Sequence, residues 1–93
     1  MAEIKISYPA GQVGPRPQKI KLNESCRFTC TDPGTLEVEF TNGSPTNKKT
    51  FKKDESFVAQ SPGRFMFKCT LTPPNGPPQV LDPSVGGEID VGG

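Results

Sequence analysis

Three cysteines are the side chains of this sequence best suited to chemistry, and no histidine accompanies them. Cys26 and Cys30 lie four residues apart in SCRFTCT, and Cys69 ends the stretch GRFMFKC. A thiolate can act as a nucleophile or as a metal ligand. Histidine, the commonest partner for both tasks, is absent from the sequence, and no glycine-rich phosphate loop precedes a helical segment. We therefore predict that the protein is not an enzyme.

The spacing of the cysteines predicts reduced thiols. Four residues along an extended strand separate two Cα atoms by about 13 Å, whereas a disulfide spans less than about 7 Å. Cys26 and Cys30 therefore cannot pair with each other in a strand, and at most one of them pairs with Cys69. We interpret all three as small apolar residues of the interior.

Alternation of apolar and polar residues predicts seven or eight short strands that would position these cysteines. In the first strand Ile4, Ile6 and Tyr8 face one way, and in the longest one Phe65, Phe67, Cys69 and Leu71 do. The strands fall at residues 3–8, 19–23, 25–31, 36–41, around 51, 56–60, 64–71 and 88–91. The predicted core contains Ile6, Ile20, Leu22, Phe28, Val38, Phe40, Phe57, Phe65, Phe67, Leu71 and Ile89.

The composition favours a single all-β domain that spans residues 1–93. Ten glycines and eleven prolines interrupt the chain, so no segment is suited to a helix of ordinary length. The Gly/Pro-rich stretch GQVGPRP and the long segment TPPNGPPQVLDPSVGG are expected to be irregular loops. We predict a seven- to eight-stranded Greek-key β-sandwich.

The charge distribution argues against nucleic-acid binding and against binding to an anionic membrane. Eleven basic and ten acidic residues give a net charge of +1, so the chain has no overall field to attract such partners. One local cluster, Lys48, Lys49, Lys52 and Lys53, surrounds Phe51 in NKKTFKKD. It has two interpretations: lysines that protect a strand edge from pairing, or a patch that binds an anionic partner.

The N-terminal sequence MAEIKISYPAG lacks the basic and apolar regions of a signal peptide, and no apolar run is long enough to span a membrane. As written, the chain is expected to be a soluble cytoplasmic monomer. A chain whose signal peptide has been removed would look the same, and would be periplasmic or secreted.

Two segments resemble the copper-binding motifs of cupredoxins of the plastocyanin and azurin type. LEVEFTNGSPTN resembles their VxFxN strand, which leads to a loop with the first copper histidine, often as Pro-His-Asn. GRFMFKC resembles the Gly-x-Tyr-x-Tyr/Phe-x-Cys strand that supplies the copper thiolate, with a second histidine and usually a methionine in the loop beyond. The resemblance covers roughly residues 18–92 and implies a cupredoxin-like sandwich with metal-site positions at Thr46, Cys69 and Thr72.

The same resemblance implies a domain without copper or any other cofactor. Thr46 stands at the first histidine position, Thr72 falls near the second, and no methionine follows Cys69. A blue-copper site needs two imidazoles and a thiolate. If Thr46, Cys69 and Thr72 converge, the missing imidazoles would leave a void that a neighbour must fill. We expect Leu81, together with Val80, to plug it.

The sequence therefore predicts a non-catalytic binding or structural module that acts on a partner, expected to be a protein, through its loops and exposed strand edges. An alternative is a ubiquitin-like sulfur carrier or protein modifier, which would act through the terminal Gly92 and Gly93. That alternative requires a helix packed across a β-grasp sheet, and no such helix is predicted from the sequence.

Overall fold

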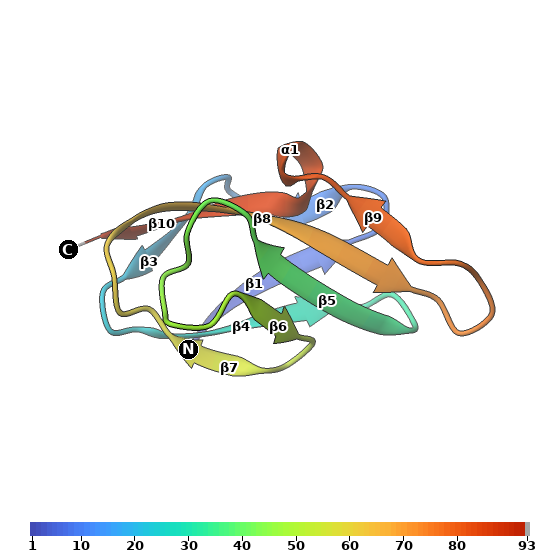
Figure 1. The fold of residues 1–93 in the computed structure, drawn as a ribbon, viewed down its shortest axis with the longest axis horizontal. Helices are drawn as coiled ribbons and strands as arrows, with labels where there is room; N and C mark the ends of the chain where they lie inside the picture. Colours follow the sequence, from blue (N-terminus) through green and yellow to red (C-terminus); the bar gives the residue numbers. More distant parts are fainter. Residues whose placement is uncertain (93) are drawn as a thin grey trace.

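Two β-sheets pack face to face in the computed structural model, which describes residues 1–92 (Figure 1). Sheet A has the order β2-β1-β4-β7, with bounds β1 (Ala2–Ser7), β2 (Gly11–Val13), β4 (Ser25–Cys30) and β7 (Ser56–Val58). Sheet B has the order β3-β10-β8-β5-β6, with bounds β3 (Gln18–Lys21), β10 (Gly87–Gly92), β8 (Gly63–Thr72), β5 (Thr35–Phe40) and β6 (Thr50–Lys52). A further strand, β9 (Gln79–Leu81), pairs with β8, and one short helix, α1 (Pro83–Gly86), follows it.

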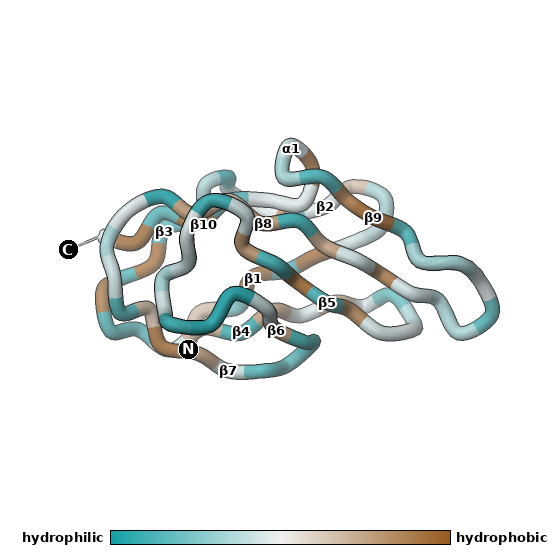
Figure 2. The backbone as a smooth tube through the Cα atoms, in the orientation of Figure 1, coloured by the Kyte–Doolittle hydropathy of each residue, from teal (hydrophilic) through white to brown (hydrophobic). Residues whose placement is uncertain are grey.

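The predicted all-β sandwich is confirmed. Apolar residues alternate with polar ones along strands such as β5 and β8 (Figure 2), and the apolar positions are the buried ones. The predicted strands correspond to β1, β3–β8 and β10. β2, β9 and α1 lie in segments that the sequence predicted to be irregular, and that prediction was wrong. Each is only three or four residues long: β2 and β9 fit between the prolines that suggested a loop, and α1 begins on Pro83.

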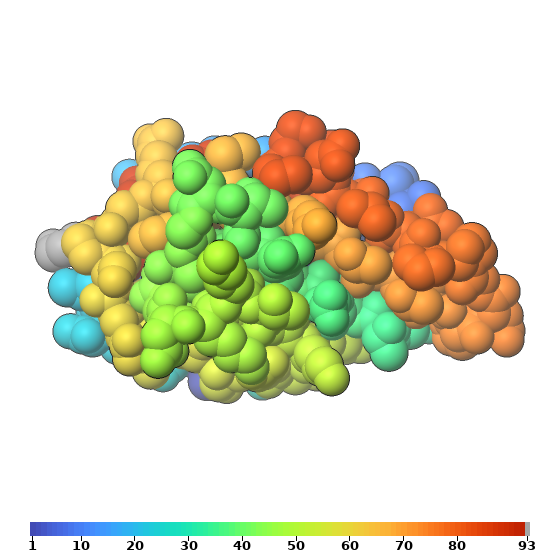
Figure 3. Space-filling view, in the orientation of Figure 1, coloured from blue at the N-terminus to red at the C-terminus, as the bar shows by residue number. Residues whose placement is uncertain are grey.

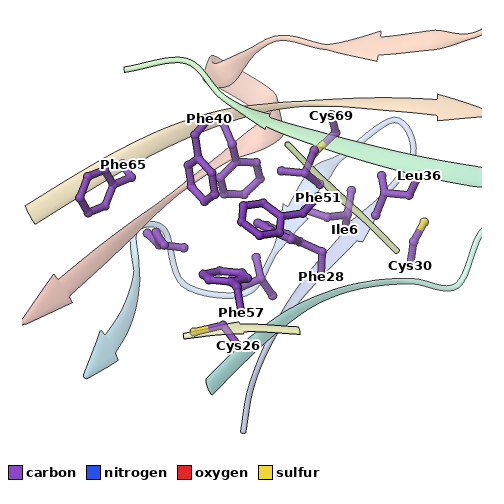
Figure 4. Close-up of a cluster of buried hydrophobic side chains, with 14 of the residues drawn as sticks. Ile6, Cys26, Phe28, Cys30, Leu36, Phe40, Phe51, Phe57, Phe65 and Cys69 are labelled. Carbon is purple, nitrogen blue, oxygen red and sulfur yellow. The ribbon is translucent and has the colours of Figure 1, made fainter. Parts of the chain in front are cut away.

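Aromatic rings from both sheets fill the centre of the sandwich (Figure 4). The ring centroid of Phe28 on β4 lies 5.1 Å from that of Phe67 on β8 and 5.7 Å from that of Phe57 on β7. The predicted core residues are buried except Leu22, which is only partly buried at the end of β3. Tyr8 is 41% exposed, against the alternation, because it lies beyond the end of β1 in the following turn.

The two corners that carry the chain from sheet B to sheet A share a local sequence pattern, Lys-x-Asn/Asp-Glu-Ser. KLNES, residues 21–25, links β3 to β4, and KKDES, residues 52–56, links β6 to β7. In each corner the fourth residue donates its backbone N–H to the carbonyl of the first. The third residue has a positive φ, 69° at Asn23 and 65° at Asp54. Asn and Asp tolerate this conformation better than most side chains, which explains their place in both turns.

A glutamate closes the outer edge of sheet B at each corner. Glu24 accepts the backbone N–H of Lys21 at 2.9 Å, and Glu55 accepts that of Lys52 at 2.9 Å. Both amides point out of the sheet, where a further strand would bind. The carboxylates therefore occupy positions that an added strand would need.

The described residues contain no helix that is long and apolar enough to cross a membrane. All three cysteines are free and buried, so their side chains lie in the interior as predicted.

Candidate functional site

Strand β8 continues past Cys69 to Thr72, and the chain then returns as β9. Cys69 lies opposite Val38 of β5 on one side and opposite Leu81 of β9 on the other. On the side of β8 that faces away from β5, β10 pairs with the first half of the strand and β9 pairs with the second half. The segment expected to be an irregular loop is therefore a β-hairpin, with α1 in the gap between β9 and β10 (Figure 1).

The setting of Cys69 disfavours a thiolate. Its side chain is fully buried, and burial raises the pKa of its thiol to about 12, with a smaller contribution from Cys30. Burial also raises the pKa of Cys26 to about 11, with the charge of Glu24 as the next cause. A protonated thiol is a poor metal ligand. Within residues 1–92, no three cysteine, aspartate or glutamate side chains are grouped so that they could hold a metal ion.

Thr46 and Thr72 do not converge on Cys69. Thr46 lies in the loop between β5 and β6, where the carbonyl of Pro45 accepts two backbone N–H groups from residues 60–61, just before β8 begins. Thr72 is the last residue of β8. A ten-residue strand spans about 30 Å, so the two threonines lie toward opposite ends of the sandwich. The expected convergence was wrong because β8 continues after the cysteine to Thr72, paired with β5 and β9.

Leu81 and Val80 behave differently although they are neighbours. Leu81 is 6% exposed and belongs to the hydrophobic core beside Cys69, whereas Val80 is 59% exposed. Successive side chains of a strand point to opposite faces, so only one of the two can reach the interior. The expectation that Val80 joins the plug was therefore wrong.

Helix α1 packs closely onto β8 and holds the end of β9. A Cβ atom added at Gly86 would lie 2.6 Å from the carbonyl oxygen of Phe67 and 3.0 Å from that of Leu81, so only glycine fits there. The guanidinium of Arg16 donates hydrogen bonds to the carbonyls of Pro83 and Ser84. These contacts fix α1 beside Leu81.

The tip of the β8–β9 hairpin forms one end of the molecule (Figure 3, orange). Residues 71–81, LTPPNGPPQVL, contain no charged side chain and four prolines, which restrict the backbone of the tip. Tyr8, in the turn between β1 and β2, donates its hydroxyl to Oε1 of Gln79 at 3.0 Å. This contact ties the base of the hairpin to sheet A and leaves the tip exposed.

The lysine cluster lies on and around β6, the outermost strand of sheet B. Lys48 forms an ion pair with Glu55, and its Nζ lies 5.3 Å from the centroid of the Phe51 ring. Lys52 lies in register with Glu37 of β5, and Lys49 and Lys53 are exposed. Acidic neighbours thus offset part of the positive charge, which favours the protection of a strand edge over the binding of an anion.

The C-terminal strand does not form a free tail up to Gly92. Gly92 pairs with Lys21, and its carbonyl accepts the N–H of Leu22 at 2.9 Å. The four-residue α1 is the only helix within residues 1–92, so the sheet-covering helix of a β-grasp fold is absent from them. The ubiquitin-like alternative therefore has no structural support; Gly93 lies outside the described residues.

Sequence reasoning missed the contact between Tyr8 and Gln79 and the exposed edge at Val80. One signal was present: the uncharged triplet QVL follows Pro78 directly and is separated from Pro83 by a single residue. Such a triplet is long enough to pair with one strand. A contact between residues 71 positions apart left no comparable signal.

The chain matches no protein-family model and no curated protein sequence. One solved structure, described as "The Structure of a Pseudoazurin From Sinorhizobium meliltoi", is similar to it, with 21% sequence identity and a TM-score of 0.52. The match covers 100% of this chain and 76% of that one. At this identity the likeness concerns the fold, and it agrees with the two-sheet arrangement described above. The chain has a cupredoxin-like β-sandwich fold.

Proposed function

We propose that this protein is a copper-free, non-catalytic binding module that recognises a protein partner through its β8–β9 hairpin. The observation that carries the proposal is the replacement of a ligand-bearing loop after Cys69 by a paired, uncharged hairpin that ends in a proline-rich tip. The module carries no cofactor, and it acts by presenting a surface.

The donor set supports the copper-free part of the proposal. The sequence has no histidine, and the remaining cysteine of the motif is fully buried with a pKa of about 12. Thr46 and Thr72, which stand at the histidine positions, lie toward opposite ends of β8. The same absence of histidine argues against general acid–base catalysis and against nucleophilic catalysis that depends on an imidazole.

The hairpin has the properties of a recognition loop. Loops held by a rigid scaffold carry much of the binding function of proteins. Prolines at positions 73, 74, 77 and 78 restrict the tip before any partner arrives, which lowers the entropy that binding costs. An uncharged surface with proline, valine and tyrosine side chains suits a protein surface with apolar pockets better than it suits a polyanion.

The proposal is tested by affinity capture with matched charge variants. Wild type, Pro74→Glu and Lys49→Glu are immobilised in equal amounts and exposed to lysate from the native cells, and retained proteins are quantified by mass spectrometry. Pro74 and Lys49 are both exposed, so neither variant should unfold the chain. We expect a specific protein to be retained by wild type and by Lys49→Glu and to be lost with Pro74→Glu.

Circular dichroism of the three proteins controls for folding. A protein retained equally by wild type and Pro74→Glu but lost with Lys49→Glu would overturn the hairpin assignment and would favour an anionic partner at the lysine cluster. The absence of any protein that distinguishes wild type from Pro74→Glu would also contradict the proposal.

A further inference from the structure

The backbone of β9 presents hydrogen-bonding groups at Val80 that face away from the sheet. Along β8 the backbone N–H and C=O groups of the even-numbered residues point toward β5, because Thr41 donates its N–H to the carbonyl of Met66. The backbone groups of the odd-numbered residues therefore point the other way, toward β9. Leu81, the register partner of Cys69, therefore points its N–H and C=O toward β8, and Val80 points its own outward. Within residues 1–92, β9 pairs with no strand other than β8.

The two outermost strands of sheet B are closed in a way that β9 is not. On β3 and β6 the outward amides of Lys21 and Lys52 are taken by Glu24 and Glu55, and the lysines themselves add charge. β9 has neither device, because Gln79, Val80 and Leu81 are uncharged. Charged side chains and capped amides are the usual means by which a protein prevents strand addition.

Other segments contact β2 and flank β7, the two outermost strands of sheet A. On β2, Gln12 accepts the N–H of Glu88 at 2.7 Å, and Gly11 lies so close to Val85 of α1 that no side chain would fit. On β7, the loop at residues 45–48 contacts the chain on both sides of the strand, through the Lys48–Glu55 ion pair and through two hydrogen bonds from residues 60–61 to the carbonyl of Pro45. Among the described residues, β9 is thus an uncharged edge of sheet B that neither a further strand nor a glutamate closes.

From this geometry we infer that β9 binds an extended, largely uncharged segment of a partner protein as an added β-strand, with Val80 at the centre of the contact. The inference rests on the proposed function and specifies its partner. The added strand exchanges two hydrogen bonds with the N–H and C=O of Val80, and its apolar side chains lie beside that of Val80. The prolines that flank the edge limit the contact to a short segment.

A peptide segment fits this edge better than a second copy of the chain. Stable dimers bury about 1,200–2,000 Å² in total, far more than a three-residue edge can supply. A short extended peptide can bind through such an edge alone.

The test uses the full chain and a phage-displayed library of random nonapeptides. Peptides selected on wild type are synthesised, and their affinities are measured for wild type, Val80→Pro and Val80→Thr. Proline removes the outward N–H, which β8 does not use, so the fold should persist. Threonine keeps the N–H and serves as the matched control. We expect Val80→Pro to weaken binding about tenfold or more, and Val80→Thr to change it by less than about threefold.

Hydrogen exchange provides a second readout on the unmodified chain. In the free protein the amide of Val80 should exchange faster than those of Gln79 and Leu81, which face β8. A selected peptide should slow exchange at Val80. Slow exchange at Val80 in the free chain at every concentration would mean that the edge is already closed, and protection that grows with protein concentration would assign the edge to a second copy. Either result overturns the inference, as does a selection whose peptides all bind Val80→Pro as well as wild type.

The two proposals can fail separately. If a cellular partner is lost with Pro74→Glu but binds Val80→Pro normally, the hairpin remains the binding site and strand addition is wrong. If neither variant affects the partner, both proposals fall.

Discussion

Cys69 and Leu81 lie opposite each other on paired strands, and both side chains are buried in the core. The register places the aliphatic side chain of Leu81 beside the thiol of Cys69. Cys69 ends the stretch GRFMFKC, which resembles the strand whose cysteine binds copper in copper-containing cupredoxins. Closure of this part of the interior therefore depends on β9, a strand of three residues.

Leu81→Ala should lower the free energy of unfolding by about 2–4 kcal/mol, because it removes buried aliphatic volume at a site fixed by α1 and β8. Urea denaturation measures this change. Val80→Ala is the matched control, since Val80 is 59% exposed, and it should cost less than about 0.5 kcal/mol. Equal effects of the two substitutions would show that Leu81 does not fill the interior as described.

Added copper should produce no intense thiolate-to-copper absorption band. The thiol of Cys69 is buried and protonated, and the two threonines at the histidine positions are far apart. For the same geometric reason, the double variant Thr46→His, Thr72→His should also remain colourless with copper, because imidazoles at opposite ends of β8 cannot reach one metal ion. An intense band in the double variant would mean that the loop and the strand end converge after all.

The stability contributed by the Cys69 thiol should be lost at alkaline pH. Its pKa rises from an ordinary 9.0 to about 12 in the folded chain, so above pH 9 the unfolded chain binds fewer protons than the folded one. Stability then falls with rising pH, by up to about 1.4 kcal/mol per pH unit for one proton. The contribution of the Cys69 thiol to the free energy of unfolding is fully present below pH 9 and declines between pH 9 and 12.

Comparison with Cys69→Ala isolates this effect from other titrating groups. At pH 8 the variant should be less stable than wild type, and the difference should shrink as the pH rises toward 11. Wild type should also react slowly with thiol reagents at Cys69 under native conditions. A pH-independent difference, or rapid labelling of Cys69, would contradict the buried and protonated thiol.

The sequence was most informative where side chains alternate along a strand. The periodicity of residues 36–40 and 64–71 predicted β5 and β8 and the burial of Phe40, Phe67 and Cys69, because a half-buried strand imposes that pattern directly. The proline-rich segment after Thr72 was misread, because proline excludes a residue from the interior of a sheet but not from the ends of a short edge strand.

The site was harder to predict than the fold. Whether Thr46 and Thr72 meet depends on whether β8 bends after Cys69, and a strand of either shape has the same alternation. The pairing of β9 with β8 brings together residues about ten positions apart across a turn, and the contact between Tyr8 and Gln79 spans 71 positions. Such contacts come from tertiary packing, which local patterns do not encode.

The repeated corners KLNES and KKDES lead to a prediction about backbone conformation. Asp54 has a φ of 65° in an exposed turn, and a β-branched side chain is strained there. Asp54→Val should therefore lower the free energy of unfolding by about 1–2 kcal/mol. Asp54→Gly should cost much less, because glycine adopts this conformation without strain. Urea denaturation of both variants measures the difference.

Lys53→Val is the control for this corner, because Lys53 is exposed and next to Asp54 but has no positive φ. It introduces the same side chain, so any general effect of an exposed valine on stability appears in both variants. Asn23→Val and Asn23→Gly should repeat the pattern at the other corner, where φ is 69°. If valine costs as much at position 53 as at positions 23 and 54, the left-handed backbone does not explain why both corners carry Asn or Asp. If valine is costly only at positions 23 and 54, the positive φ explains why both corners carry Asn or Asp. The glutamate that follows each of these residues then closes the strand edge.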